Sequence, residues 1–348
     1  MSDASFDDVV QIENLTKQYG EFVALDRLSL SLQKGDILGF IGPNGAGKTT
    51  TIKILVGLTR PTSGVARIAG ADCVTESRKV RRLIGYMPDK FGSYDNMRVR
   101  EYLDFFGAAY GVPRRERRRR VAEVLEITNA TWMQDRYVES LSHGMQQRIG
   151  IARTLIHQPD VLILDEPANG LDPQARIEMR EILLRLASEG KTLIVTSHIL
   201  PELARICDRV AIIANGQLKA LGNLREVTSQ LTQRRTFEAQ CVGGEHLETI
   251  EREVTGMLDD TTDVSTSDTE SIVRFRTAAS DERLAEVLRK LISLGTDLTQ
   301  FREVAGDLEE AFVTATQEAL AESTDSATQA SDSATQADPG TPVTEAVE

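Results

Sequence analysis

The chain has 348 residues and a net charge of −13, from 40 Lys and Arg against 53 Asp and Glu, so it is acidic and long enough for about two domains. This charge argues against a nucleic-acid partner, and the three widely spaced cysteines exclude a CxxC metal or redox pair and favour a reduced, cytoplasmic setting. No leader-like segment and no uncharged apolar run of about 18 residues occur, so we expect any membrane role to be peripheral.

Residues 9–225 predict an α/β domain with a mixed, largely parallel sheet, because short runs of Ile, Leu and Val alternate with longer helical patterns. Residues 78–156 are rich in charged helical patterns, and we interpret them as a helical insertion. The clearest strands are expected to be buried on both faces, at residues 37–41, 161–164, 193–196 and 210–213.

Residues 234–320 predict a separate small α+β domain in which three strands alternate with three helices. The last helix is expected to start at Asp307, because Asp307 followed by Glu310 is an N-cap arrangement. The other elements are expected at 236–242, after Gly244, and at 271–276, 281–294 and 298–304.

Residues 321–348 contain the hexapeptide DSATQA twice and no Lys, Arg or aromatic residue. Such a segment cannot bury enough apolar surface to offset the entropy of the chain. We therefore expect a disordered acidic tail, and a protease-resistant tail would contradict that expectation.

A glycine-rich loop follows the predicted strand 37–41 and precedes a helical stretch, and it has the P-loop pattern GxxxxGK[ST]. The glycines let backbone amides turn inward toward phosphate, Lys48 supplies a full positive charge, and the Thr49 hydroxyl is placed to ligate Mg²⁺. We expect nucleotide phosphates to be bound by Gly42, Pro43, Asn44, Gly45, Ala46, Gly47, Lys48, Thr49 and Thr50.

Two carboxylates, Asp165 and Glu166, end the apolar strand that begins at Val161. Ligands of open α/β sheets gather at the carboxyl ends of strands. We expect Asp165 to hold the metal and Glu166 to act as general base toward the attacking water.

The sequence LSHGMQQR at residues 141–148 identifies the class of P-loop protein. Ser142 and Gly144 place a small hydroxyl and a bare backbone at a helix start, which is a second anion site. The segment resembles the signature motif of the ATP-binding cassette (ABC) family, with His143 and Met145 where Gly and Gln are commoner. In that family this site closes on the γ-phosphate of ATP held by a second subunit. We interpret His143 as a surface histidine without a role.

Further positions match this family in order and spacing over residues 9–221. Tyr19 is similar to the aromatic residue that stacks on adenine, and the loop from Asn169 to Asp172 resembles the one that contacts the opposite subunit. His198 resembles the switch histidine that reaches the γ-phosphate, so Lys48, Glu166 and His198 are the expected catalytic residues.

Asp89 departs from the commonest family pattern, which has Gln at this place. An Asp can ligate Mg²⁺ and order water, but it adds negative charge beside Asp165, Glu166 and the triphosphate. We therefore expect Asp89 to slow ATP turnover or to make it depend on a partner.

The resemblance implies an ATPase that binds ATP and Mg²⁺ as a homodimer or heterodimer of cassettes. The helical insertion is then expected to pass the motion to a separate integral membrane permease, at the cytoplasmic face of the cell membrane. Residues 94–106, the NGLD loop and the ending LEEAFV resemble exporter-type cassettes that carry a C-terminal accessory domain.

Two other interpretations remain open at this point. Six arginines within residues 114–120 could bind lipid headgroups or nucleic acid, although a solvated helix face is the simpler explanation. The alternative function is a soluble ABC ATPase that acts as a nucleotide-dependent switch or sensor without transport. Asp89 leaves this alternative open, whereas Glu166 and His198 speak against it.

Overall fold

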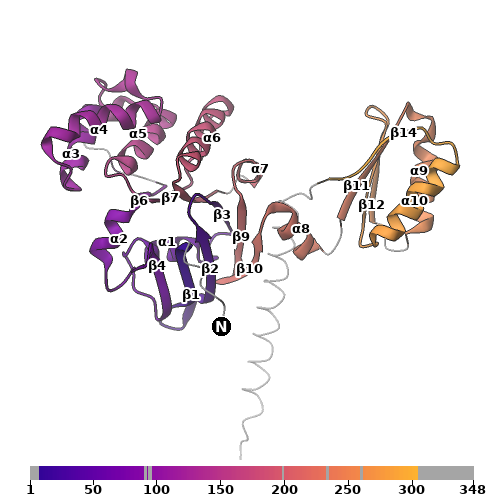
Figure 1. Cartoon of the computed structure of the whole chain (residues 1–348), viewed down its shortest axis with the longest axis horizontal. Helices are drawn as coiled ribbons and strands as arrows, with labels where there is room; N and C mark the ends of the chain where they lie inside the picture. Colours follow the sequence, from indigo (N-terminus) through magenta and orange to yellow (C-terminus); the bar gives the residue numbers. More distant parts are fainter. Residues whose placement is uncertain are drawn as a thin grey trace, which may run out of the picture.

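The computed structural model describes residues 8–89, 92, 96–197, 200–232, 235–258 and 262–304. Its central layer is a six-stranded sheet in the order β10-β9-β3-β8-β7-β6 (Figure 1). All neighbouring pairs from β9 to β6 are parallel, and β10 is antiparallel to β9. The strands are β3 (Ile37–Ile41), β6 (Ile84–Met87), β7 (Val161–Asp165), β8 (Thr192–Thr196), β9 (Arg209–Ala214) and β10 (Gln217–Gly222).

This central sheet is buried on both faces, as its apolar strands predict. Residues Ile37 and Ile41 of β3 belong to one hydrophobic cluster, while Leu38 and Phe40 belong to another. Successive residues of a strand point to opposite faces, so one strand supplies both cores. The prediction of a mixed, largely parallel sheet is confirmed.

A second, antiparallel sheet in the order β2-β1-β4-β5 packs over one of these faces. It consists of β1 (Asp8–Tyr19), β2 (Phe22–Gln33), β4 (Ser63–Ile68) and β5 (Ala71–Asp72). Helix α1 (Lys48–Leu55) shares the cluster between the two sheets through Ile52 and Ile54. The P-loop that begins this helix is therefore fixed between two packed layers.

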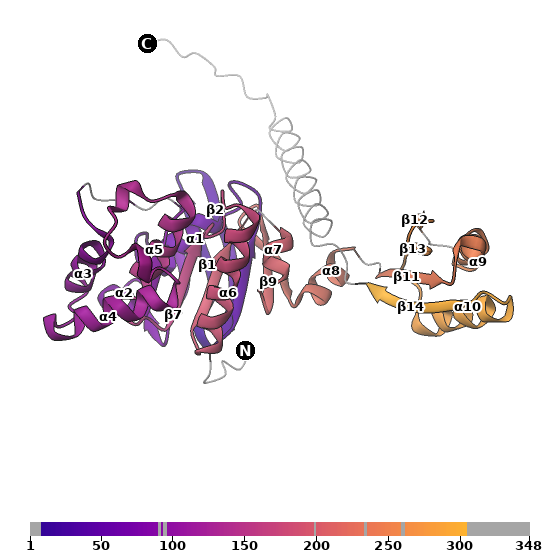
Figure 2. The same ribbon diagram turned by 90° about the horizontal axis from the view of Figure 1, so that it is seen from above.

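The opposite face of the central sheet is covered by helices (Figure 2). Within residues 8–232, helices α3 and α4 lie at one end and β9 lies toward the other. The elements outside the central sheet are α2 (Ser77–Leu83), α3 (Val99–Ala109), α4 (Arg114–Ile127), η1 (Thr131–Met133), η2 (Val138–Ser140), α5 (His143–Leu155), α6 (Pro173–Ser188), α7 (Leu200–Ala204) and α8 (Leu224–Thr232).

The helical insertion predicted for residues 78–156 starts too early. Residues 84–87 form β6, which pairs with β7 at the edge of the central sheet. This strand has only four residues and directly follows a charged helix. Its apolar run is therefore too short to be recognised as a strand from the sequence. The inserted helical layer begins at α3.

The arginine run in α4 has two kinds of members. Arg120 is buried and donates hydrogen bonds to the carbonyls of Leu155 and Ile156, and Arg117 is paired with Asp104. The other four arginines of the run are exposed. Part of the run thus fastens α4 to its neighbours, and the rest forms the solvated face that the simpler explanation expects.

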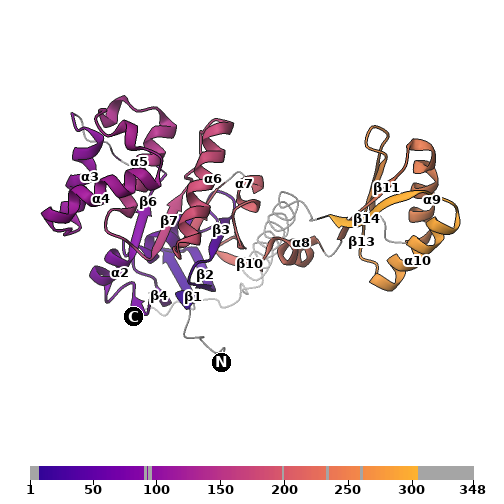
Figure 3. The ribbon, with the colours of Figure 1, turned by 45° about the horizontal axis from the view of Figure 1, so that its top comes forward.

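The C-terminal unit has a sheet and a hydrophobic cluster of its own (Figure 3). The chain order is β11 (Arg235–Cys241), η3 (Gly244–His246), α9 (Leu247–Met257), β12 (Thr262–Ser267), β13 (Ile272–Thr277), α10 (Asp281–Ser293) and β14 (Leu298–Val304). The strand order β12-β13-β11-β14 with antiparallel pairs makes this βαββαβ unit a ferredoxin-like fold. Strand β12 is not among the elements predicted for this unit.

Two predictions fall outside the described residues: the helix from Asp307 and the tail 321–348. Within the described part of the chain, the structure has no helix that is both long and apolar enough to cross a membrane.

Candidate nucleotide site

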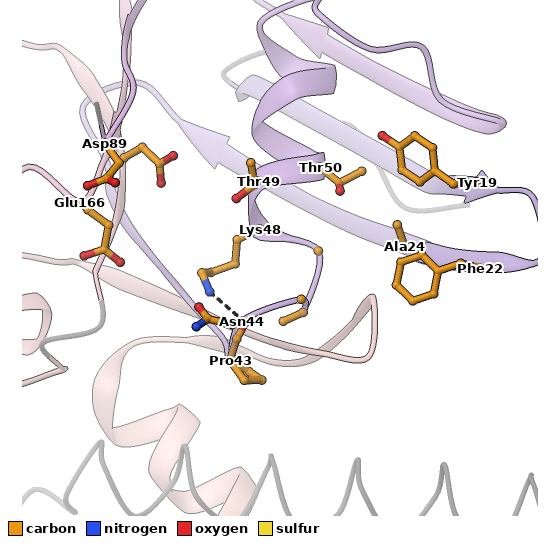
Figure 4. A pocket seen from close by; sticks show the side chains of 14 residues that line it. Tyr19, Phe22, Ala24, Pro43, Asn44, Lys48, Thr49, Thr50, Asp89 and Glu166 are labelled. Carbon is orange, nitrogen blue, oxygen red and sulfur yellow. Dashed lines mark hydrogen bonds between the residues drawn. The ribbon is translucent and has the colours of Figure 1, made fainter. Parts of the chain in front are cut away.

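The P-loop and the end of β7 line one cavity of about 400 Å³ (Figure 4). Tyr19, Phe22 and Ala24 lie at one end of it, and Asp89 and Glu166 lie at the other, beyond Lys48 and Thr49. The predicted residues that line it are Tyr19, Pro43, Asn44, Gly45, Ala46, Gly47, Lys48, Thr49, Thr50, Asp89, Asp165 and Glu166.

The P-loop turn depends on glycine at two places. Gly47 has a φ of +109°, and a Cβ there would lie 2.6 Å from Leu25 Cδ2 and 2.7 Å from the Ala24 carbonyl oxygen. A Cβ at Gly42 would lie 2.4 Å from the Ile213 carbonyl oxygen. Only glycine fits these positions, and helix α1 starts directly after Gly47 with its free amide groups at the cavity.

Lys48 bends back over the loop that precedes it. Its Nζ donates hydrogen bonds to the carbonyl oxygens of Gly42, at 2.5 Å, and Pro43, at 3.0 Å. Burial lowers the pKa of Lys48, and the nearby carboxylates of Glu166 and Asp165 oppose that shift. The ammonium group is therefore held at the cavity beside two carboxylates, where a phosphate can compete for it.

Three carboxylates reach the cavity from two strand ends. Asp89 lies just after β6, Asp165 is the last residue of β7, and Glu166 directly follows it. The Thr196 hydroxyl of β8 donates to Asp165 Oδ1 at 2.7 Å and accepts from the Glu166 amide at 3.0 Å. Glu166 has a φ of +55°, a conformation that few residues other than glycine adopt, and this turn is fixed by Thr196.

The described residues contain no group of three or more His, Cys, Asp and Glu side chains arranged as a metal centre. The oxygens of Thr49, Asp89 and Asp165 are the hard donors that suit Mg²⁺, which proteins bind through one or two carboxylates together with substrate phosphates. The residues present fit such an ion when it arrives with a nucleotide.

Ser142, Gly144 and Asp172 do not join this cavity. They line a second cavity of about 410 Å³ with Trp132 and residues at the starts of α5 and α6. Ser142 is the N-cap of α5 and accepts from the Met145 amide, and Asp172 is the N-cap of α6 and accepts from the Ala175 amide at 2.8 Å. Within one subunit, the signature residues and the P-loop belong to separate surfaces.

His143 is exposed, but it is not a free surface residue. Its Nε2 lies 2.8 Å from the carbonyl oxygen of Asn169, in the loop between β7 and α6. The same Asn169 places its side-chain amide 3.5 Å from Asp89 Oδ1. His143 thus contacts the loop that reaches Asp89, which a surface histidine without a role would not be expected to do.

Three lining residues were not predicted from the sequence: Phe22 and Ala24 in the first cavity and Trp132 in the second. Phe22 pairs with Tyr19 across the turn between β1 and β2, and the residue is 61% exposed. The signal available in the sequence was a second aromatic residue three positions after Tyr19. His198 lies outside the described residues.

The sequence matches the model of the ABC transporter family over residues 25–169. It is 40% identical to Nod factor export ATP-binding protein I of Ralstonia nicotianae over 220 residues, which are 63% of this chain and 68% of that protein. It is 39% identical to linearmycin resistance ATP-binding protein LnrL of Bacillus subtilis over 223 residues, 64% of this chain and 72% of that one.

The fold is similar to a dimeric structure of MJ0796, described as a bacterial ABC transporter cassette. The TM-score is 0.57 at 28% identity, over 62% of this chain and 99% of that one. The P-loop, the carboxylates at the end of β7 and the signature helix α5 thus lie in a cassette fold, and the match covers more than two thirds of the length of each of the two relatives named above. The chain belongs to the family of ATP-binding subunits of ABC transporters.

Proposed function

We propose that the chain is the ATP-hydrolysing motor of an exporter-type ABC transporter and that it acts on a separate integral membrane permease. The observation that carries this proposal is the single cavity in which a P-loop, Lys48 and three carboxylates meet. A site that only bound nucleotide would not need a carboxylate such as Glu166 at the end of β7, where it can reach an attacking water.

The roles of the residues follow from their places. The triphosphate lies over the backbone amides of residues 42–50, and Lys48 leaves its two carbonyl partners to bind the terminal phosphates. Thr49, Asp165 and Asp89 would hold Mg²⁺, which neutralises charge on the phosphates. Glu166 takes a proton from the water whose oxygen bonds to the γ-phosphorus. The bond between the γ-phosphorus and the β–γ bridging oxygen breaks, ADP leaves with its electron pair, and inorganic phosphate is the second product.

Two roles come only from the family resemblance. Tyr19 is proposed to stack on adenine, and its ring is exposed at the end of the cavity beside Phe22. His198 is proposed to contact the γ-phosphate.

A second cassette is proposed to complete each site, in a homodimer or heterodimer. Ser142, Gly144 and Asp172 line a cavity apart from their own P-loop, which is the arrangement expected if they serve the nucleotide of a partner. A head-to-tail pair of this kind is closed by a two-fold axis and buries two nucleotides. A dimer occurs in the similar structure of MJ0796.

The exporter type is supported by the relatives, of which one is named for Nod factor export and another for linearmycin resistance. We propose that residues 9–225 are the ATP-binding domain, that its helical layer transmits closure to the permease at the cytoplasmic face of the membrane, and that residues 234–320 are an accessory domain.

The test is the ATPase rate of the full chain with Glu166→Gln. The matched control is Glu189→Gln, since Glu189 is an exposed acid at the end of α6 that is paired with Arg185. The proposal predicts that Glu166→Gln loses nearly all turnover while Glu189→Gln keeps it. Equal rates in Glu166→Gln and the parent chain would favour the alternative, a nucleotide-dependent switch without turnover.

Transport is tested by fractionating cells that contain the tagged chain. We expect it to sediment with membranes and to copurify with a protein that spans the membrane. Sedimentation with ribosomes and not with membranes would contradict the transport role, because it would indicate a soluble ABC ATPase that acts on ribosomes.

A further inference from the structure

From its contacts we infer that His143 is a positioning residue for ATP hydrolysis: it ties the loop of residues 166–172 to the start of the signature helix α5. The inference deepens the proposed function and rests on it. It reverses the expectation that His143 has no role.

The imidazole is seated on the backbone of that loop by two contacts. Its Nε2 lies 2.8 Å from the Asn169 carbonyl oxygen. Gly170, with a φ of +68°, lies against the ring, because a Cβ there would be 3.3 Å from both Cδ2 and Nε2 of His143. A side chain at residue 170 would have to push the ring aside.

The bond to Asn169 fixes the protonation of the ring. A carbonyl oxygen only accepts, so Nε2 must carry the hydrogen. The side-chain nitrogen of Gln147, one helical turn along α5, lies 3.4 Å from the same Nε2 and cannot donate to it. A half-turn of the buried Gln147 amide would place Oε1, which has no hydrogen-bond partner in the described structure, beside this N–H group as a second acceptor, shared with the Asn169 carbonyl.

The loop that His143 holds connects both proposed half-sites. Glu166 lies at its first residue and Asp172 at its last, and Asn169 in between reaches Asp89 with its side chain. His143 directly follows Ser142, the N-cap of α5. One hydrogen bond therefore links residues around the subunit's own nucleotide to residues proposed to contact the nucleotide of the partner.

A second tie joins α5 to α6 further along, where Arg148 forms an ion pair with Glu178. This pair holds the two helices together without touching the loop. Loss of His143 should therefore leave the helices packed but let residues 166–172 shift relative to Ser142, and the cost should fall on turnover instead of on folding or nucleotide binding.

The experiment compares three variants of the full chain by ATPase kinetics and thermal midpoint. His143→Leu keeps the bulk of the side chain without a donor, and His143→Gln keeps an N–H group at the position of Nε2. The control is His246→Gln, because His246 lies in η3 of the C-terminal unit.

We expect His143→Leu to lower kcat about fivefold, the effect of one hydrogen bond, with the KM for ATP and the thermal midpoint unchanged. His143→Gln should restore most of the rate. An unchanged kcat in His143→Leu would overturn the inference, as would a fall that His143→Gln does not restore or a parallel drop in thermal midpoint. If Glu166→Gln also keeps full activity, the proposed function itself fails, and the two failures are thereby distinguished.

Discussion

At the level of single residues, two glycines of the P-loop separate the effect of the backbone angle φ from the effect of the room available for a side chain. Gly45 and Gly47 both have positive φ, +83° and +109°. No atom lies within 4 Å of a Cβ built on Gly45, whereas a Cβ on Gly47 would collide with Leu25 and the Ala24 carbonyl. The two glycines are therefore a matched pair for testing what the loop requires.

We predict that Gly47→Ala abolishes measurable ATP binding and that Gly45→Ala weakens it only mildly. An alanine with positive φ raises the conformational free energy of the backbone by about 1–2 kcal/mol. This is the only cost expected for Gly45→Ala. Gly47→Ala adds two contacts below 3 Å and must displace β2 or the start of α1. Equilibrium binding of a fluorescent ATP analogue measures both variants, and equal affinities would contradict the geometry.

Asp89 permits a second prediction at this scale. It shares the cavity with Asp165, Glu166 and the proposed triphosphate, so a neutral side chain should lower the repulsion in the state that hydrolyses ATP. We expect Asp89→Gln to raise the ATPase rate about threefold or more. Asp89→Asn removes the same charge without adding length and is the control for size. A rate unchanged in Asp89→Gln would argue against a braking role.

Much of the site could be predicted from single residues. The P-loop pattern, Asp165, Glu166 and Asp89 fall in one cavity because each lies at or just after the carboxyl end of a parallel strand of the central sheet. The bond between His143 and Asn169 could not be predicted, because it joins the first residue of α5 to a loop 26 positions further on, and their approach depends on how α5 and α6 pack.

At the level of elements, β6 is joined to the segment after α5 by the half-buried His157. His157 donates from Nε2 to the Ile84 carbonyl oxygen at 2.9 Å, and its ring stacks on Tyr110 with 3.9 Å between the centroids. Its Nδ1 is buried and has no hydrogen-bond partner. Burial lowers the pKa of His157, although the bond to Ile84 opposes the shift.

A pH dependence of stability follows from this histidine. The folded chain binds the proton less readily than the unfolded chain, so stability is fully present above the ordinary pKa of 6.5 and is lost as the pH falls below it toward the lowered pKa. Denaturant midpoints of the parent chain should therefore decline between pH 7.5 and pH 5. His157→Gln should flatten this decline and His246→Gln should not, and identical slopes in all three would contradict the assignment.

The elements that could be predicted are those whose apolar runs are continuous, such as β3 and β8, in which every residue is buried. The sheet formed by β1, β2, β4 and β5 was not identified, because the pairing of β1 with β2 is interrupted by register shifts and Asn14 has a φ of +46°. Strand β12 has the sequence TDVSTS, with one large apolar residue, so only its pairing with β13 reveals it.

At the scale of the whole molecule, the C-terminal unit has its own hydrophobic cluster, built around Phe237, Val273 and Phe275. None of its members belongs to the two clusters of the ATP-binding region. The ferredoxin-like unit is therefore expected to unfold independently.

We predict that Phe275→Ala destabilises the C-terminal unit by about 3–5 kcal/mol and leaves the ATPase rate within twofold of the parent chain. Phe275 is fully buried, so its removal leaves a cavity that the unit cannot fill. Calorimetry should show one transition shifted to lower temperature and the other in place. A single shared transition that moves as a whole would show that the two units fold together.

In the proposed function, two cassettes close around two nucleotides. Each nucleotide site is formed by the P-loop of one cassette and by Ser142 and Gly144 of the other. The most direct measurement is the mass of the Glu166→Gln chain in solution by sedimentation, with and without Mg²⁺ and ATP. We expect a dimer with ATP and a monomer without it. Ser142→Arg should prevent the dimer, because an arginine at the N-cap of α5 would fill the second cavity. A chain that stays monomeric with saturating ATP, or a dimer that Ser142→Arg leaves intact, would contradict the proposed function.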